Sequence, residues 1–173
     1  MGSLQQALPH PVDAETEAAI LELLRRKVTG AVSLFVQTVR AAEELYGPEA
    51  PARIRQRMLE RTLESAAARG VSAAERSPRA YCAAMDVSCR GSHEWVKLED
   101  SETRQAYRYT RCLWAEAFRA LDAADLGLWV CESDGPAVAA YDPRIRFQRS
   151  RTLMAGDDCC DHVYWCDDDA REG

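Results

Sequence analysis

Hydrophobic residues recur every three or four positions from Asp13 to Tyr46, the spacing at which side chains share one face of an α-helix. Asp13 or Thr16 fits the N-cap of this predicted helix, and the run Tyr46-Gly47-Pro48 is a stop signal. Gly30 lowers helix stability by about 1 kcal/mol relative to alanine, so a kink or break at that point is an open alternative. The apolar stripe consists of Ile20, Leu23, Leu24, Val28, Val32, Phe35, Val36 and Val39.

A second helical stripe runs from about Pro51 to Arg69, and Gly70 is its expected end. Residues 72–84 form a weaker helical candidate, because Pro78 interrupts the pattern.

We therefore assign residues 13–84 to a helical scaffold region, preceded by a disordered amino terminus at residues 1–12. Nothing in these helices points to catalysis. Two long amphipathic helices also offer a surface to a second copy of the chain, so we expect a homodimer.

The pattern changes near Met85 to short apolar runs separated by turns, which is typical of strands. Alternating residues on both sides of the polar turn at residues 99–102 predict a β-hairpin. Residues 112–124 return to helical spacing, and Gly127 is expected to end that helix. The run Ser133-Asp134-Gly135-Pro136 is a strong turn signal. Further short strands are predicted at residues 128–131, 145–147, 151–154 and 161–165.

Helices followed by short strands predict an α+β fold, in which N-terminal long helices pack against a small C-terminal antiparallel sheet. Residues 85–166 make up the α+β region, and residues 167–173 form an acidic tail. The whole chain is expected to be one compact domain.

Length and composition narrow the class of protein. The 173 residues, 47% of them hydrophobic, are enough to fill one core. The net charge of −6 disfavours nucleic acid as a partner, and no apolar run reaches the roughly 20 residues that a membrane span needs. The amino terminus has no secretory pattern, so we expect a cytoplasmic protein. The alanine- and arginine-rich composition is typical of a bacterial source.

Cysteines are numerous, and all seven follow residue 81. An odd number without a CxxC pair indicates reduced thiols rather than disulfides or a zinc ribbon. Cys112, Cys131 and Cys160 fall at predicted element boundaries, from which side chains converge on one pocket. A helix amino terminus would also lower the pKa of the Cys112 thiol. The alternative is that each cysteine is a small buried apolar residue.

Polar residues near these cysteines offer acid–base chemistry. Cys160 and His162 share one face of a strand, where an imidazole would activate the thiol or join it in holding a soft metal. Asp134 and Asp157 are candidate acid–base groups, although aspartate is also common in turns and solvated loops. Gly156 permits a positive φ that would present backbone N–H groups to an anion; a plain loop glycine is the alternative.

Arginines alternate where a strand is expected, in the order Arg144, Arg146, Arg149 and Arg151. On one face of a strand, Arg149 and Arg151 would bind a substrate carboxylate by bidentate pairing. The alternative is that these arginines are solvent-exposed strand residues with no role in binding.

Four segments of the second half stand in a characteristic order. They are Arg111-Cys112, Val130-Cys131-Glu132-Ser133-Asp134, Tyr141-Asp142-Pro143, and the run from Arg149 to Asp161 that contains Gly156-Asp157-Asp158-Cys159-Cys160. This order resembles the L-2-amino-thiazoline-4-carboxylic acid hydrolase family, over residues 85–166 and with a similar helical lead-in. One residue departs from the resemblance, because an aromatic residue such as Phe is expected at His162.

The resemblance implies a hydrolase that cleaves a C–N or C–S bond in a small cyclic amidine or imine bearing a carboxylate. Cys160 would be the nucleophile, with Cys112 and Cys131 beside it. Asp134 and Asp157 would move protons, and an arginine would hold the carboxylate. This chemistry needs no cofactor. A divalent metal held by cysteine, histidine or aspartate is the mechanistic alternative.

Two other classes of function stay open at this point. One is a ring-forming or ring-opening enzyme of specialised metabolism on the same scaffold. The other is a non-enzymatic module that binds a metal or a small molecule through its cysteines.

Overall fold

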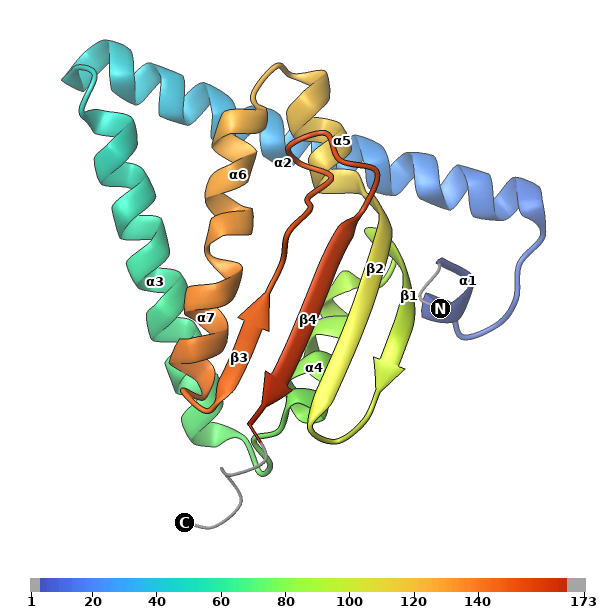
Figure 1. Cartoon of the computed structure of the whole chain (residues 1–173). Helices are drawn as coiled ribbons and strands as arrows, with labels where there is room; N and C mark the ends of the chain where they lie inside the picture. Colours follow the sequence, from blue (N-terminus) through green and yellow to red (C-terminus); the bar gives the residue numbers. More distant parts are fainter. Residues whose placement is uncertain (1–3, 168–173) are drawn as a thin grey trace.

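The computed structural model describes residues 4–167, which form helices and one sheet (Figure 1). The elements in chain order are α1 (Leu4–Ala7), α2 (Ala14–Tyr46), α3 (Ala50–Ser72), α4 (Pro78–Cys89), β1 (His93–Asp100), β2 (Arg104–Cys112), α5 (Leu113–Ala120), α6 (Ala124–Glu132), α7 (Asp134–Tyr141), β3 (Ile145–Gln148) and β4 (Cys160–Cys166). The predicted α+β class is confirmed.

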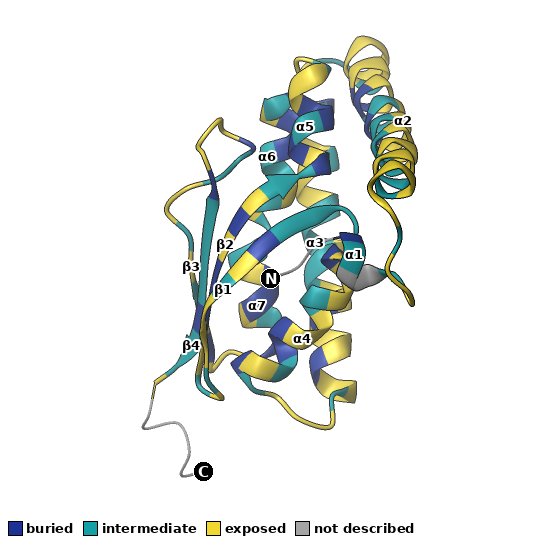
Figure 2. Ribbon diagram, turned by 90° about the vertical axis from the view of Figure 1, so that its right-hand side faces the viewer, coloured by how far each residue is buried: buried dark blue, intermediate teal, exposed yellow. Residues whose placement is uncertain are grey.

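The four strands form one antiparallel sheet in the order β1-β2-β4-β3. Helices α2 to α7 lie on one side of this sheet, and the described part of the chain leaves the other face open (Figure 2). Side chains on the helix-facing side, such as Tyr107, Tyr109 and Tyr164, are buried. The space between sheet and helices is therefore where a core and a ligand cavity can form.

Helix α2 is one uninterrupted helix, as the apolar stripe predicted. Asp13 caps it by accepting a hydrogen bond from the Thr16 N–H at 2.8 Å, and it passes through Gly30 without a break. Its buried residues Val32, Val36 and Val39 pack in a cluster that includes Phe118 and Met154. No helix in the described range 4–167 is long and apolar enough to cross a membrane.

The predicted end of α3 at Gly70 is wrong, because the helix continues to Ser72. Gly70 lies inside the helix, where α3 packs closely on α7. A Cβ atom at this position would meet the Tyr141 carbonyl oxygen at 2.0 Å. The glycine is thus needed for the close approach of two backbones and does not terminate the helix.

Helix α4 corrects two further predictions. Pro78 does not interrupt it but begins it, because proline fits the first turn of a helix, and Ser77 accepts a hydrogen bond from the Ala80 N–H at 3.1 Å. The helix then continues to Cys89, so the strand pattern starts at His93 and not near Met85.

The segment between Cys112 and Tyr141 is more helical than its sequence predicted. The predicted strand at residues 128–131 belongs to α6, and Gly127 lies inside that helix. The predicted turn at Ser133 is the junction at which α6 passes into α7. A short apolar run has no periodicity that distinguishes a strand from a buried helix, which explains the error.

Strands β3 and β4 confirm the predictions at residues 145–147 and 161–165, but residues 151–154 form a loop. Side chains replace strand pairing there. The Asp161 carboxylate accepts hydrogen bonds from the Ser150 and Arg151 N–H groups at 2.9 and 2.6 Å, and Asp157 accepts one from Thr152 at 2.7 Å. These bonds satisfy the backbone N–H groups of residues 150–152, which have no neighbouring strand to pair with.

The disordered amino terminus at residues 1–12 stays a prediction, and the structure describes this segment from Leu4 onward. Leu4 is buried, and the Gln5 side chain donates hydrogen bonds to the Val12 carbonyl at 3.0 Å and to Glu17 at 2.8 Å. Of the predicted acidic tail, only Asp167 lies within the described residues. The homodimer stays a prediction.

Candidate active site

A cavity of about 330 Å³ lies between the sheet and the helices, within the size range of small-molecule sites. Six of the nine residues that the sequence nominated line it together. They are Cys112, Cys131, Asp134, Arg149, Cys160 and His162. The remaining wall comes mainly from apolar and aromatic side chains, namely Met85, Cys89, Tyr109, Trp114, Phe118, Val130 and Met154, with Ser88, Ser92 and His93.

The ends of four elements bring these residues together. Cys160 opens β4 opposite Tyr109 of β2, and His162 follows on the same face of the strand. Cys131 lies in the last turn of α6, and Asp134 is the first residue of α7. The bend between these two helices places both side chains at one cavity wall.

Asp134 and Arg149 form an ion pair inside the cavity. The Arg149 Nη1 donates to the Asp134 Oδ2 at 2.6 Å, and its Nη2 donates to the Cys131 carbonyl at 3.0 Å. Burial raises the pKa of Asp134 to about 6, although Arg149 acts in the opposite direction. Because this pKa is close to neutral, Asp134 can take up or release a proton at physiological pH.

His162 is a neutral imidazole in this site. Burial first, and then the charge of Arg149, lower its pKa to about 3. Its Nδ1 shares a hydrogen bond with the Tyr164 hydroxyl at 3.1 Å, and its Nε2 is buried with no hydrogen-bond partner among the described residues. An imidazolium that would lower the pKa of Cys160 is therefore absent at neutral pH.

Cys112 caps helix α5, where its Sγ accepts a hydrogen bond from the Ala115 N–H at 3.4 Å. The expectation that the helix terminus lowers its pKa is wrong. Backbone N–H groups do act in that direction, but burial outweighs them and raises the pKa to about 12. The protonated thiol is therefore the favoured form of Cys112.

Cys131 and Cys160 lie in more polar surroundings than Cys112. Burial raises the pKa of both thiols, and the positive charge of Arg149 opposes that rise in both cases. The Thr152 hydroxyl lies between them, 3.9 Å from the Cys131 Sγ and 3.7 Å from the Cys160 Sγ. The Leu153 N–H donates a hydrogen bond to the Cys160 Sγ at 3.3 Å.

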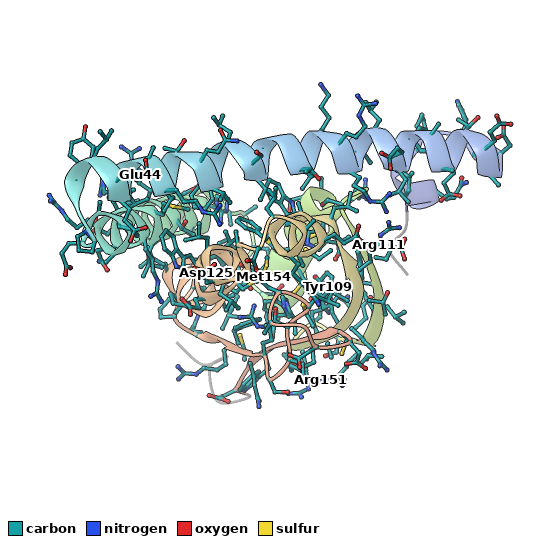
Figure 3. All side chains as sticks on the ribbon, turned by 90° about the horizontal axis from the view of Figure 1, so that it is seen from above. Glu44, Tyr109, Arg111, Asp125, Arg151 and Met154 are labelled. Atoms are coloured by element: carbon teal, nitrogen blue, oxygen red, sulfur yellow. The ribbon has the colours of Figure 1, made fainter. Side chains whose placement is uncertain are left out.

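Three nominated residues do not line the cavity. Asp157 accepts the Thr152 N–H and thereby shapes the loop before β4. Gly156 adopts a positive φ of 103°, but the side chain nearest to it is that of the exposed Arg119. Arg151 is exposed and lies at the outer edge of the molecule (Figure 3). Its guanidinium pairs with Asp158. The alternation of Arg149 and Arg151 fails because these residues follow β3 in a loop.

Sequence reasoning missed several cavity residues. Tyr109, Trp114 and His93 line the cavity, but the sequence motifs nominate none of them. Thr152 lies beside the sulfur atoms of Cys131 and Cys160, but it has no distinguishing feature in a run that the sequence predicts to be a strand. Their contribution depends on how α5 and β2 meet, and a single sequence carries no signal for that arrangement.

No three histidine, cysteine or acidic side chains gather at metal-binding distance anywhere in residues 4–167. The cavity residues include three nominated thiols and the carboxylate of Asp134. A cavity of this size, lined mainly by apolar side chains with a few polar groups, is typical of small-molecule sites.

The chain belongs to the L-2-amino-thiazoline-4-carboxylic acid hydrolase family, whose model matches residues 25–164. This confirms the resemblance and extends it, because the match includes most of α2 and all of α3. The family's name indicates hydrolase activity. No curated protein matches the chain.

Proposed function

We propose that the protein hydrolyses a C–N or C–S bond in a small cyclic amidine or imine that bears a carboxylate, at the cavity described above. One observation carries the proposal. Cys131, Cys160, Asp134 and Arg149 line one cavity of about 330 Å³ in a chain of this hydrolase family. A flat heterocycle fits the aromatic wall, and its polar atoms would face the thiols and the ion pair.

Cys160 is the nucleophile in this proposal. Its thiolate adds to the ring carbon between the heteroatoms, one ring bond breaks, and the leaving atom takes a proton. Water then adds to the same carbon and releases the thiolate, so that the net change is the addition of one water molecule. Cys160 is favoured over Cys112, because burial raises the pKa of the Cys112 thiol to about 12, whereas the Leu153 N–H, the Thr152 hydroxyl and the charge of Arg149 oppose the rise at Cys160.

The ion pair would supply both charge and protons. Arg149 uses two N–H groups within the protein and has others for a substrate carboxylate. Asp134, with a pKa of about 6, is the proton carrier for the leaving atom and for the attacking water. The unpartnered His162 Nε2 offers one further hydrogen bond to the ring or to that water.

The experiment is turnover of L-2-amino-thiazoline-4-carboxylate by the purified chain, followed by mass spectrometry. We expect a product heavier than the substrate by one water, formed faster than in a reaction without protein. The Arg149→Lys variant keeps the charge but loses the planar fork, so its KM should rise about ten-fold or more. If the wild-type chain leaves this compound unchanged, and leaves analogues with other ring heteroatoms unchanged, the proposal is wrong.

A further inference from the structure

The loop between β3 and β4, residues 149–159, is held in place by carboxylates at its base. Asp161 accepts hydrogen bonds from the N–H groups of Ser150 and Arg151, and it also accepts the Ser150 hydroxyl. Asp157 accepts the Thr152 N–H at 2.7 Å, and its own N–H donates to the Thr152 carbonyl at 3.2 Å. Thr152 is therefore fixed from both sides before any ligand binds.

This anchoring places a backbone N–H donor and a hydroxyl group beside one sulfur atom. The Leu153 N–H lies 3.3 Å from the Cys160 Sγ, and the Thr152 Oγ1 lies 3.7 Å from it. The Met154 N–H donates to the Thr152 Oγ1 at 3.3 Å and occupies one of its acceptor positions. The hydroxyl proton remains free to point at a sulfur.

We propose that Thr152 and the Leu153 N–H form a cradle for the Cys160 thiolate, and that Thr152 is a positioning residue of this site. In the thiol form, the Cys160 S–H donates to the Thr152 oxygen. When the S–H bond breaks and its proton leaves to water, the hydroxyl rotates and donates its own proton to the sulfur. Hydrogen bonds to an ionised acceptor are stronger than those to a neutral one, so the cradle favours the thiolate.

The other groups around Cys160 leave room for such an effect. Arg149 favours the thiolate and Asp134 disfavours it, so their charges act against each other. His162 is neutral, as are the thiols of Cys112 and Cys131. Cys131 competes for the Thr152 hydroxyl at 3.9 Å, and formation of the Cys160 thiolate would draw that hydroxyl away from it.

The inference rests on the proposed role of Cys160, but its test needs no substrate. The alkylation rate of Cys160 by iodoacetamide is measured from pH 6 to 10 in the native chain, with peptide mass spectrometry to identify the labelled cysteine. Thr152→Val removes the hydroxyl and should slow the alkylation of Cys160 about ten-fold at pH 7, with the rate profile moved to higher pH. Thr152→Ser keeps the hydroxyl and should restore the wild-type profile.

Cys166, at the opposite end of β4, is the internal control, and its profile should be the same in all variants. Thr152→Ala removes the same hydroxyl without placing a methyl group beside either sulfur, and it carries the comparison if Thr152→Val does not fold. An unchanged Cys160 profile in a folded variant without the hydroxyl overturns the cradle, whatever happens to turnover. Normal turnover in Cys160→Ser would instead overturn the proposed function, and the alkylation result would stand.

Discussion

Two arginine–aspartate pairs flank β3, and the same two residue types behave differently in them. Asp142 accepts three hydrogen bonds from Arg144, from its N–H at 2.9 Å, its Nε at 3.0 Å and its Nη2 at 2.7 Å. These bonds hold the pKa of Asp142 below its usual value. Asp134 accepts one such bond, because Arg149 directs its second group to the Cys131 carbonyl, and burial raises its pKa to about 6.

The difference lies in how completely the hydrogen bonds replace lost water. Asp142 is 2% exposed in its side chain but fully bonded, so it stays ionised and fixes the turn into β3. The Asp134 side chain is 31% exposed, because it opens onto the cavity, and it is only partly bonded. A carboxylate left with spare bonding capacity beside a thiol is suited to chemistry, whereas a saturated one is suited to structure.

Of the two paired aspartates, Asp134 should have the larger effect on turnover when it is replaced, as in Asp134→Asn. If Asp134 carries protons during the reaction, turnover should fall by about 100-fold, since positioned acid–base groups typically contribute that much. In the wild type, activity should decline below pH 6 as the carboxylate becomes protonated, and the variant should lose this decline. Steady-state rates between pH 5 and 9 test both statements. A variant with the wild-type rate and the same acid limb would remove Asp134 from the mechanism.

Asp142→Asn should act on stability and not on the pH profile of turnover. We expect a loss of about 2 kcal/mol in the free energy of unfolding at pH 7, because bonds to an ionised acceptor become bonds to a neutral one. The folded pKa of Asp142 is lowered, so its contribution is present above the unfolded pKa and is lost as the pH falls through the folded value. In urea unfolding, the free energies of unfolding of the wild type and the variant should differ by a large amount at pH 7 and by a small amount at pH 3. Equal losses at both pH values would contradict this.

His162→Phe should weaken the pH dependence of stability. The folded pKa of His162, about 3, lies below its unfolded value, so stability is lost as the pH falls from about 6.5 toward 3. Between pH 7 and pH 5 this group alone accounts for about 2 kcal/mol, and the variant should lose that part. His93, whose pKa burial also lowers, should leave a smaller residual dependence. Identical pH curves for the two proteins would show that His162 is exposed to water.

Arg151→Ala should have the smallest effect. Its guanidinium pairs with Asp158 on the exposed side of the loop, so we expect less than about 0.5 kcal/mol in stability and no change in KM. A rise in KM as large as that of Arg149→Lys would show that Arg151 binds the substrate. This result would contradict its position outside the cavity.

How far the sequence predicts this protein depends on the kind of signal each segment carries. The periodic stripe of α2 and its Asp13 cap are local, and they gave the longest helix correctly. The sequence predicts a helix end at Gly70, since the close contact with Tyr141 that requires this glycine is a tertiary feature. Composition therefore identifies a glycine, but only packing assigns its role.

The candidate site shows the same limit. The ordered motifs brought Cys131, Asp134 and Cys160 together correctly, because they stand at element ends that a family pattern marks. Thr152 was missed, since its importance lies in two distances to sulfur atoms. The predicted strand also gave Arg151 the wrong position, because the side chains of Asp157 and Asp161 hold this segment as a loop.

The central claim is that Cys160 acts at the cavity while its neighbour Cys159, which is 2% exposed and does not line the cavity, serves the fold. The most direct measurement compares kcat/KM for Cys160→Ser and Cys159→Ser on a substrate that the wild type converts, with circular dichroism to show that both variants fold. We predict a fall of about 1,000-fold or more for Cys160→Ser and a change of less than about three-fold for Cys159→Ser. Near-normal turnover in a folded Cys160→Ser variant would contradict the account.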